Sequence, residues 1–255
     1  MIVAENVHKG FGPNKVLRGI DLKVEKGKNL VILGGSGSGK STFLKCVIGL
    51  LRPDQGRILA DGKDVNRLQT EIEVGDYRRR FGYLFQEGAL FDSLSVWENV
   101  TFALKYLRED IPPDKYREVA RQKLDLVGLS GIEDHRPSEL SGGMKKRVAL
   151  ARAIAAEPDY ILYDEPTTGL DPIMSDVIND LILALKKKLG VTSISVTHDM
   201  KSAFKIADEI VVFYEGRVLE AGTPQQIRDT SNPAVRQFIE GRSQGPIQMK
   251  VREYE

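Results

Sequence analysis

Residues 34–41 read Gly34-Gly35-Ser36-Gly37-Ser38-Gly39-Lys40-Ser41, and they fit the pattern G-x-x-x-x-G-K-[ST] at every fixed position. Glycines let a backbone curl so that consecutive N–H groups point at an anion, and a helix that begins directly behind them adds its positive end. The Lys40 ammonium can reach β- and γ-phosphates, and the Ser41 hydroxyl can ligate Mg²⁺. The stretch therefore predicts a cradle for nucleotide phosphates between a strand and a helix.

The flanking sequence supplies both elements. Leu30–Leu33 is a short, wholly apolar run, as expected for a strand buried on both faces, and Thr42–Leu51 is typical of a helix. Further strands are expected at Ile2–Val7, Val16–Val24, Arg57–Lys63 (a hairpin that turns at Asp61-Gly62), Phe81–Phe85, Tyr160–Tyr163, Ser193–Val196 and Ile210–Tyr214. Helices are expected at Ser175–Leu189 and in a mostly helical stretch from Leu90 to Ala156. This order predicts an α/β fold with a helical insertion near its middle.

The composition is that of an ordinary globular protein, with 255 residues, 41% of them hydrophobic and 29% charged. A net charge of +1 gives no sign of a nucleic-acid binder, although it leaves a local basic patch possible. The single cysteine, Cys46, has no partner for an internal disulfide. Because no window approaches the roughly 20 apolar residues that span a bilayer, any membrane association is expected to go through a partner.

Two acids, Asp164 and Glu165, follow the predicted strand at Tyr160–Tyr163. The carboxyl ends of parallel strands face one crevice, so these acids are expected beside the phosphate cradle. Asp164 would hold Mg²⁺ through water, and Glu165 would polarise an attacking water as general base. His198 follows another predicted strand at the same edge. It could hold that water and the γ-phosphate, but its position alone suits a capping or core histidine equally well.

A second anion-binding pattern, Leu140-Ser141-Gly142-Gly143, precedes a helix expected at Val148–Ala156. One subunit has no use for two cradles around one nucleotide. A head-to-tail dimer has, because each nucleotide then lies between one loop from each chain.

In their order along the chain, these motifs resemble those of the ATP-binding-cassette (ABC) family. The order comprises Gly34–Ser41, Gln86 after a strand, Leu140–Gly143, Asp164-Glu165, Gly169-Leu170-Asp171 and His198. The resemblance implies an α/β P-loop NTPase fold with a RecA-like core, an antiparallel β subdomain and an inserted α-helical subdomain. We expect one domain over residues 1–240, its helical subdomain at about 90–156, and a tail at 241–255 that is a possible dimer contact.

The resemblance also implies a role for each residue that matches a motif. ATP would be held by Phe11 stacking on the adenine, by Val16, and by Gly34, Gly35, Ser36, Gly37, Ser38, Gly39, Lys40, Ser41 and Thr42. Glu165, His198, Gln86 and Lys40 would be catalytic, and Mg²⁺ would be held by Ser41, Gln86 and Asp164. Ser141, Gly142 and Gly143 would close on the ATP of the other subunit, with Asp171 at the dimer seam. Met144 stands where the family most often has glutamine, and Phe11 replaces the commoner tyrosine.

Residues 85–100, with the pattern Gln-x-Gly-Ala-Leu-Phe, resemble the ATPases of Mla/Mce-type phospholipid transporters more specifically. That subgroup implies a homodimer at the cytoplasmic face of the inner membrane, a permease and an Mce-domain protein. Leu90–Val100 would border a groove for a permease helix, although plain packing explains the same apolar residues. The alternatives are the ATPase of an amino-acid-type importer or of a division-associated complex, and a soluble non-transport ABC ATPase. A GTPase is disfavoured because the chain has no N-K-x-D motif.

Overall fold

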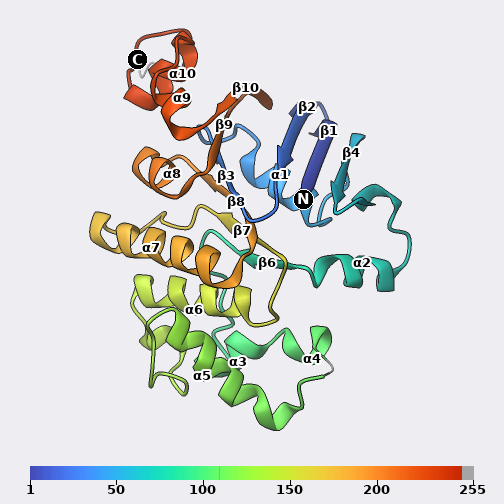
Figure 1. Cartoon of the computed structure of the whole chain (residues 1–255), viewed down its shortest axis with the longest axis vertical. Coiled ribbons are helices and arrows are strands. Elements are labelled where there is room, and N and C mark those ends of the chain that lie inside the picture. The colour runs from blue at the N-terminus through green and yellow to red at the C-terminus, as the bar shows by residue number, and fades with distance from the viewer. Residues whose placement is uncertain (109, 249–255) are drawn as a thin grey trace.

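The computed structural model describes residues 1–108 and 110–248, and Figure 1 shows sheets with helices around them. The strands are β1 (Ile2–Phe11), β2 (Asn14–Val24), β3 (Asn29–Leu33), β4 (Gln55–Ala60), β5 (Lys63–Asp64), β6 (Phe81–Leu84), β7 (Tyr160–Asp164), β8 (Thr192–Thr197), β9 (Glu209–Tyr214) and β10 (Arg217–Gly222). The helices are α1 (Lys40–Val47), α2 (Glu71–Arg78), α3 (Val96–Thr101), α4 (Leu104–Leu107), α5 (Tyr116–Leu126), α6 (Gly142–Ile154), α7 (Pro172–Leu189), α8 (Met200–Ile206), α9 (Pro224–Arg228) and α10 (Pro233–Glu240). Short 3-10 turns lie at Val65–Arg67, Pro113–Lys115 and Pro137–Glu139.

The central sheet has the strand order β10-β9-β3-β8-β7-β6, and only β10 pairs in the antiparallel sense. The apolar run of β3 is buried throughout because its side chains alternate between two cores. Val31 and Leu33 face the core shared with α6 and α7, whereas Leu30 and Ile32 face the core shared with α1. The predicted α/β fold is confirmed.

A smaller sheet, β2-β1-β4-β5, is wholly antiparallel and covers the α1 side of the central sheet. Its hairpin β4–β5 turns at Asp61-Gly62, where both residues have a positive φ that suits a tight two-residue turn. This confirms the turn expected from the sequence.

Helices α3 to α6 gather at one end of the molecule, and α9 and α10 at the other, in Figure 1. Helix α6 approaches β6 so closely that a Cβ on Gly82 would lie 2.2 Å from the carbonyl oxygen of Ala153. A glycine in that strand is therefore required by the contact between helix and sheet. Among the residues that the structure describes, none of the helices has the length and apolar character to cross a bilayer.

Several boundaries differ from the sequence-based expectations. Helix α1 ends at Val47 because Gly49, with φ of 73°, takes the left-handed conformation that terminates helices. Helix α6 begins at Gly142 rather than Val148, because the Ser141 hydroxyl caps it by accepting from the Met144 N–H at 3.3 Å. The patterns did not predict α2, α8, α9, α10 and β10.

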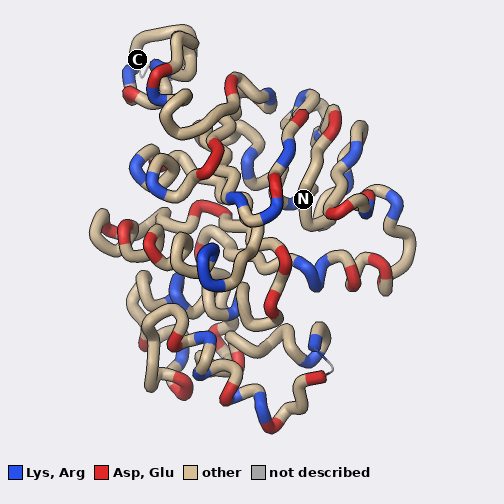
Figure 2. The backbone as a smooth tube through the Cα atoms, viewed as in Figure 1, with Lys and Arg blue, Asp and Glu red and all other residues tan. Residues whose placement is uncertain are grey.

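Charge is mixed over the whole chain. Figure 2 shows Lys and Arg interspersed with Asp and Glu on both sheets and on the helices. Basic and acidic residues therefore alternate along the described chain and do not separate into one basic and one acidic region of the sequence.

Candidate functional site

A cavity of about 1270 Å³ lies at the carboxyl edge of the central sheet. The segments after β3, β6, β7 and β8 all reach it, because parallel strands end at the same edge. Its lining includes residues 35–42, Val16, Gln86, Glu165 and His198. The structure thus brings together most residues that the sequence predicted to act on one nucleotide.

The loop between β3 and α1 is shaped by its glycines. Gly37 and Gly39 have φ of 78° and 102°, a region that side-chain-bearing residues rarely adopt. A Cβ on Gly34 would lie 2.5 Å from the Phe213 carbonyl oxygen, so the loop also needs glycine for space. The buried Ser38 Oγ has no hydrogen-bond partner among the described residues. A loop of this shape, with an unpaired hydroxyl, fits an oxyanion ligand.

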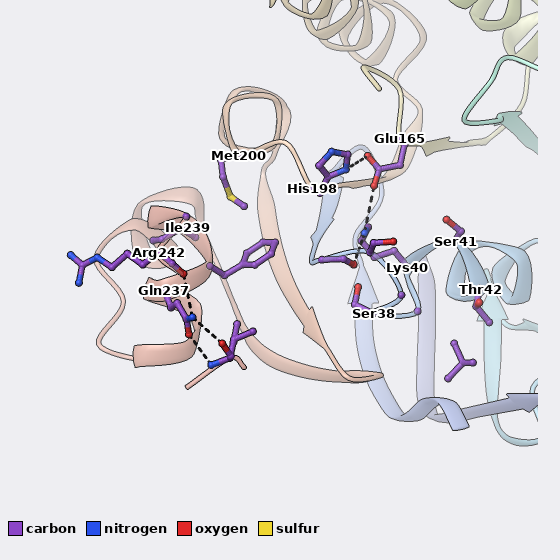
Figure 3. Close-up of a pocket in the computed structure, with 18 of the residues that line it drawn as sticks. Ser38, Lys40, Ser41, Thr42, Glu165, His198, Met200, Gln237, Ile239 and Arg242 are labelled. Atoms are coloured by element: carbon purple, nitrogen blue, oxygen red, sulfur yellow. Dashed lines mark hydrogen bonds and ion pairs between the residues drawn. The ribbon is translucent and has the colours of Figure 1, made fainter. Parts of the chain in front are cut away.

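Lys40 is buried at the first position of α1, and its ammonium lies inside the loop. Its Nζ donates to the carbonyl oxygens of Gly34 and Gly35 at 2.8 and 3.1 Å, and it lies 3.5 Å from Glu165 Oε1. Figure 3 shows Lys40 and His198 approaching Glu165 from different sides. Burial lowers the pKa of Lys40, and the neighbouring Glu165 and Asp164 carboxylates oppose that shift.

Glu165 is held by several contacts at the end of β7. Its Oε2 lies 2.9 Å from His198 Nδ1 and accepts a hydrogen bond from Thr168 Oγ1 at 3.1 Å. Its backbone N–H donates to Val196 of β8 at 2.9 Å, and its φ is 49°. Left-handed backbone at a residue other than glycine is uncommon and clusters at functional sites, where surrounding contacts enforce it. No pattern in the sequence indicated the contact with Thr168.

Asp164 faces the hydroxyl of Ser41. Its Oδ1 accepts from Ser41 Oγ at 2.7 Å, and its Oδ2 accepts from Tyr83 OH at 3.0 Å. Burial raises the pKa of Tyr83, and the adjacent Asp164 carboxylate adds to that shift, so the phenol stays a donor. The described residues hold no cluster of three His, Cys, Asp or Glu side chains that could bind a metal. A hydroxyl beside a carboxylate, with Gln86 near, is nevertheless an oxygen donor set that suits Mg²⁺.

Gln86 is exposed just after β6 and borders two hollows. One is the cavity that holds the phosphate loop, and the other is a groove of about 560 Å³ whose lining includes Leu90, Pro137 and Lys145. Ser41 also lines both. Gln86 therefore lies between the cavity with the phosphate loop and the groove, and a ligand in either one could contact it.

Besides Gly34 and Asp164, whose contacts with Lys40 and Ser41 are given above, three predicted groups do not line this cavity. Ser141 and Gly142 are exposed at the start of α6, Gly143 is buried, and none of the three lines the cavity. Asp171 caps α7 by accepting from the N–H groups of Ile173 and Met174 at 2.9 and 3.0 Å. Phe11 is 49% exposed at the end of β1, with Lys9 Nζ 5.6 Å from its ring centroid. Their contacts with adenine and with a second chain stay predictions.

One wall of the cavity was not expected. It comes from α10 and the following residues up to Ile247, and a Cβ on Gly35 would lie 3.9 Å from the ring of Phe238. Gln237 holds the segment, since its side chain accepts from the Ile247 N–H at 2.7 Å and donates to the Ile247 carbonyl at 3.0 Å (Figure 3). The Asn232-Pro233 pair, a helix-start signal, could have revealed α10.

Comparison with known proteins places the chain in context. The family described as "ABC transporter" matches residues 17–168. The chain is 42% identical over 250 residues to the intermembrane phospholipid transport system ATP-binding protein MlaF of Haemophilus influenzae, covering 98% of this chain and 94% of that protein. It is also 42% identical to the L-cystine import ATP-binding protein TcyN of Bacillus subtilis, covering 94% and 92%. A solved dimeric ATP-binding cassette in a post-hydrolysis state with ADP and Pi superposes with a TM-score of 0.81 at 32% identity, covering 88% of this chain and 99% of that one.

Proposed function

Because the chain belongs to the ABC transporter family, we propose that it drives phospholipid movement across a cell envelope through a partner permease. It is an ATP-binding, ATP-hydrolysing subunit with the P-loop ABC ATPase fold. The observation that supports ATP hydrolysis as the driving reaction is the set of contacts of Glu165 with Lys40 and His198 beside the phosphate loop. Similarity to MlaF over nearly the whole chain supports phospholipid as the cargo.

The site supports these roles. Glu165 takes the proton of the water that attacks the γ-phosphorus, while His198 and Thr168 orient its carboxylate. Lys40 and the N–H groups of the loop stabilise the charge on the transferring phosphoryl group. Phosphate oxygens that attract the Lys40 ammonium would also release Glu165 from its ion pair with that residue. Positioning and electrostatics thus supply most of the catalysis, because phosphoryl transfer needs little covalent help.

We propose that the site is completed by a second copy of the chain. Ser141 and Gly142 are exposed at the start of α6, where their donors can reach another molecule's nucleotide. The solved relative with ADP and Pi is dimeric. The proposed domain comprises residues 1–240 with the helical subdomain at about 90–156, and the tail at 241–255 contacts the partner chain. Of that tail, residues 249–255 lie outside the described part of the structure.

Mg²⁺ is the proposed cofactor, held by Ser41 and Gln86, with Asp164 behind Ser41. When bound, it would neutralise charge on the β- and γ-phosphates. Ser41→Ala should raise the Mg²⁺ concentration for half-maximal ATP turnover by at least about tenfold, because it removes one oxygen ligand. The measurement is ATPase rate against Mg²⁺, with an EDTA arm in which turnover should cease. Ser130→Ala, at an exposed hydroxyl that donates to Asp125 at 2.6 Å, is the matched control. An unchanged Mg²⁺ requirement in Ser41→Ala would remove Ser41 from the metal site.

The groove beside Gln86 is the proposed docking site for a cytoplasmic helix of the permease. Phe85, Ala89 and Leu90 line it, and Phe85 is 38% exposed, so apolar side chains are available there to a docking helix. Docking there would place the chain at the cytoplasmic face of the inner membrane as a peripheral subunit. An Mce-domain protein is the proposed further component. The proposed partners are proteins, and nucleic acid is not among them.

Purification of the chain from native membranes tests the transport assignment. We expect it to bring down a permease and an Mce-domain protein encoded near it, and the complex in proteoliposomes should move a fluorescent phospholipid only with hydrolysable ATP. The rival is an amino-acid importer, which the similarity to TcyN favours. ATP-dependent uptake of labelled cystine without lipid movement would select the rival.

A further inference from the structure

Lys146 is a buried cation on α6 with an unusual environment. Only 5% of the residue is exposed, and none of the ion pairs between described residues includes it. Its Nζ instead donates to the carbonyl oxygen of Gln86 and lies 3.4 Å from that of Glu165. One ammonium therefore contacts the main chains of two residues that act on the nucleotide.

Burying an ammonium is costly unless its protons are used. Burial lowers the pKa of Lys146, and the carboxylates of Glu165, Asp164 and Glu87 oppose that shift. If Lys146 only filled space here, the folded protein would be less stable with it than with an apolar side chain of similar length. Methionine has a similar length but no N–H donor, so the hydrogen bonds of the ammonium are what lysine adds at this position.

A second cation on α6 binds the same segment. Arg152 Nη1 donates to the Ala89 carbonyl at 2.7 Å, and its Nη2 donates to the Gly88 carbonyl. The segment is sharply bent between these points, since Gly88 and Ala89 have φ of 76° and 48°. Residues 86–89 are therefore held to α6 at both ends, and Ser141 is the residue that caps the start of this helix.

We propose that Lys146 is a positioning residue that fixes the backbones of Gln86 and Glu165 relative to the helix carrying Ser141. Gln86 borders both the nucleotide cavity and the groove, so this contact links the groove, the catalytic carboxylate and the surface offered to a second chain. The inference rests on the roles proposed above for Gln86 and Glu165.

The test compares Lys146→Met, which has no donor, with Lys146→Gln, which keeps a neutral one. Measurements use the whole chain at protein concentrations at which the proposed dimer is fully formed. Lys146→Met should lower kcat by about 10- to 100-fold, since misplacement of a reacting group by about 1 Å can cost 10²-fold. The KM for ATP should change by less than about threefold, because the phosphate loop is intact. Lys146→Gln should give an intermediate kcat.

Lys123→Met is the matched control. Lys123 is also a buried lysine of the helical part, but it pairs with Glu157 at 2.9 Å and lines none of the hollows described above. Its replacement should lower thermal stability without lowering kcat at a temperature where the chain is folded. Circular dichroism and the fluorescence of Trp97, the single tryptophan, report folding for every variant.

A double-mutant cycle with Gln86→Ala separates positioning from plain stability. If Lys146 acts through Gln86, Lys146→Met should cost less in the Gln86→Ala background than in the wild type. A wild-type kcat in Lys146→Met would overturn the inference, and fully multiplicative losses would overturn the part of it that concerns Gln86. If Lys146→Met does not fold, the test uses Lys146→Gln, and a wild-type kcat in that variant would overturn the inference. Glu165→Gln is assayed in parallel, so that failure of the proposed base is seen separately.

Discussion

Replacing Glu165 by glutamine should slow ATP turnover by about 10²- to 10⁴-fold, the usual contribution of a general base. The amide keeps the size of the carboxylate and can still meet His198, but it cannot accept the proton of the attacking water. ATP binding should persist, because the phosphate loop is unchanged. With hydrolysis blocked, the variant should also accumulate as an ATP-bound dimer. Steady-state ATPase assays and size-exclusion chromatography with ATP measure the two effects.

Glu157→Gln is a suitable control for this variant. Glu157 is also a glutamate with positive φ, at 56°, and it also pairs with basic side chains, Lys123 and Arg108. Glu157 lines neither the cavity nor the groove, so the ATP turnover of Glu157→Gln should stay near that of the wild type. Hydrolysis by Glu165→Gln at the wild-type rate would show that another group is the base.

Lys40→Ala should weaken ATP binding by about 10- to 100-fold. A hydrogen bond to a charged group contributes about 1.5–3 kcal/mol, and each 1.4 kcal/mol is a factor of about ten in Kd. The same change removes the cation 3.5 Å from Glu165 and the donor to the Gly34 and Gly35 carbonyls, so the loop itself loses support. Isothermal titration calorimetry with ATP gives the affinity directly.

Lys187→Ala, at an exposed lysine near the end of α7, controls for the loss of one positive charge. It should leave the Kd for ATP unchanged, because surface charges at a distance are screened by salt. An undiminished affinity in Lys40→Ala would mean that the loop binds phosphate through its N–H groups alone.

The α/β class and the position of the phosphate loop could be predicted because their signals are local. A wholly apolar strand, a run of glycines and a following helix are contiguous in sequence, and each demands its own backbone geometry. The proximity of Glu165 and His198 to the loop was also predictable, because parallel strands present their carboxyl ends at one edge. The late elements α8, α9 and α10 were not predicted, since their short amphipathic patterns are weak beside their tertiary contacts.

The sequence by itself determined which chemistry this chain carries: a phosphate cradle, two acids and a histidine after strands, and a second cradle suited to another molecule. Only the tertiary structure decided what holds those groups in place. Thr168 on Glu165, Tyr83 on Asp164, and Lys146 on the carbonyls of Gln86 and Glu165 are such supports. The contacts of Tyr83 and Lys146 join groups far apart in the sequence, and a backbone carbonyl looks the same at every residue. The contact of Thr168 is local, but it depends on the fold of the turn after β7. No residue pattern encodes them, so they appear only when the chain is folded.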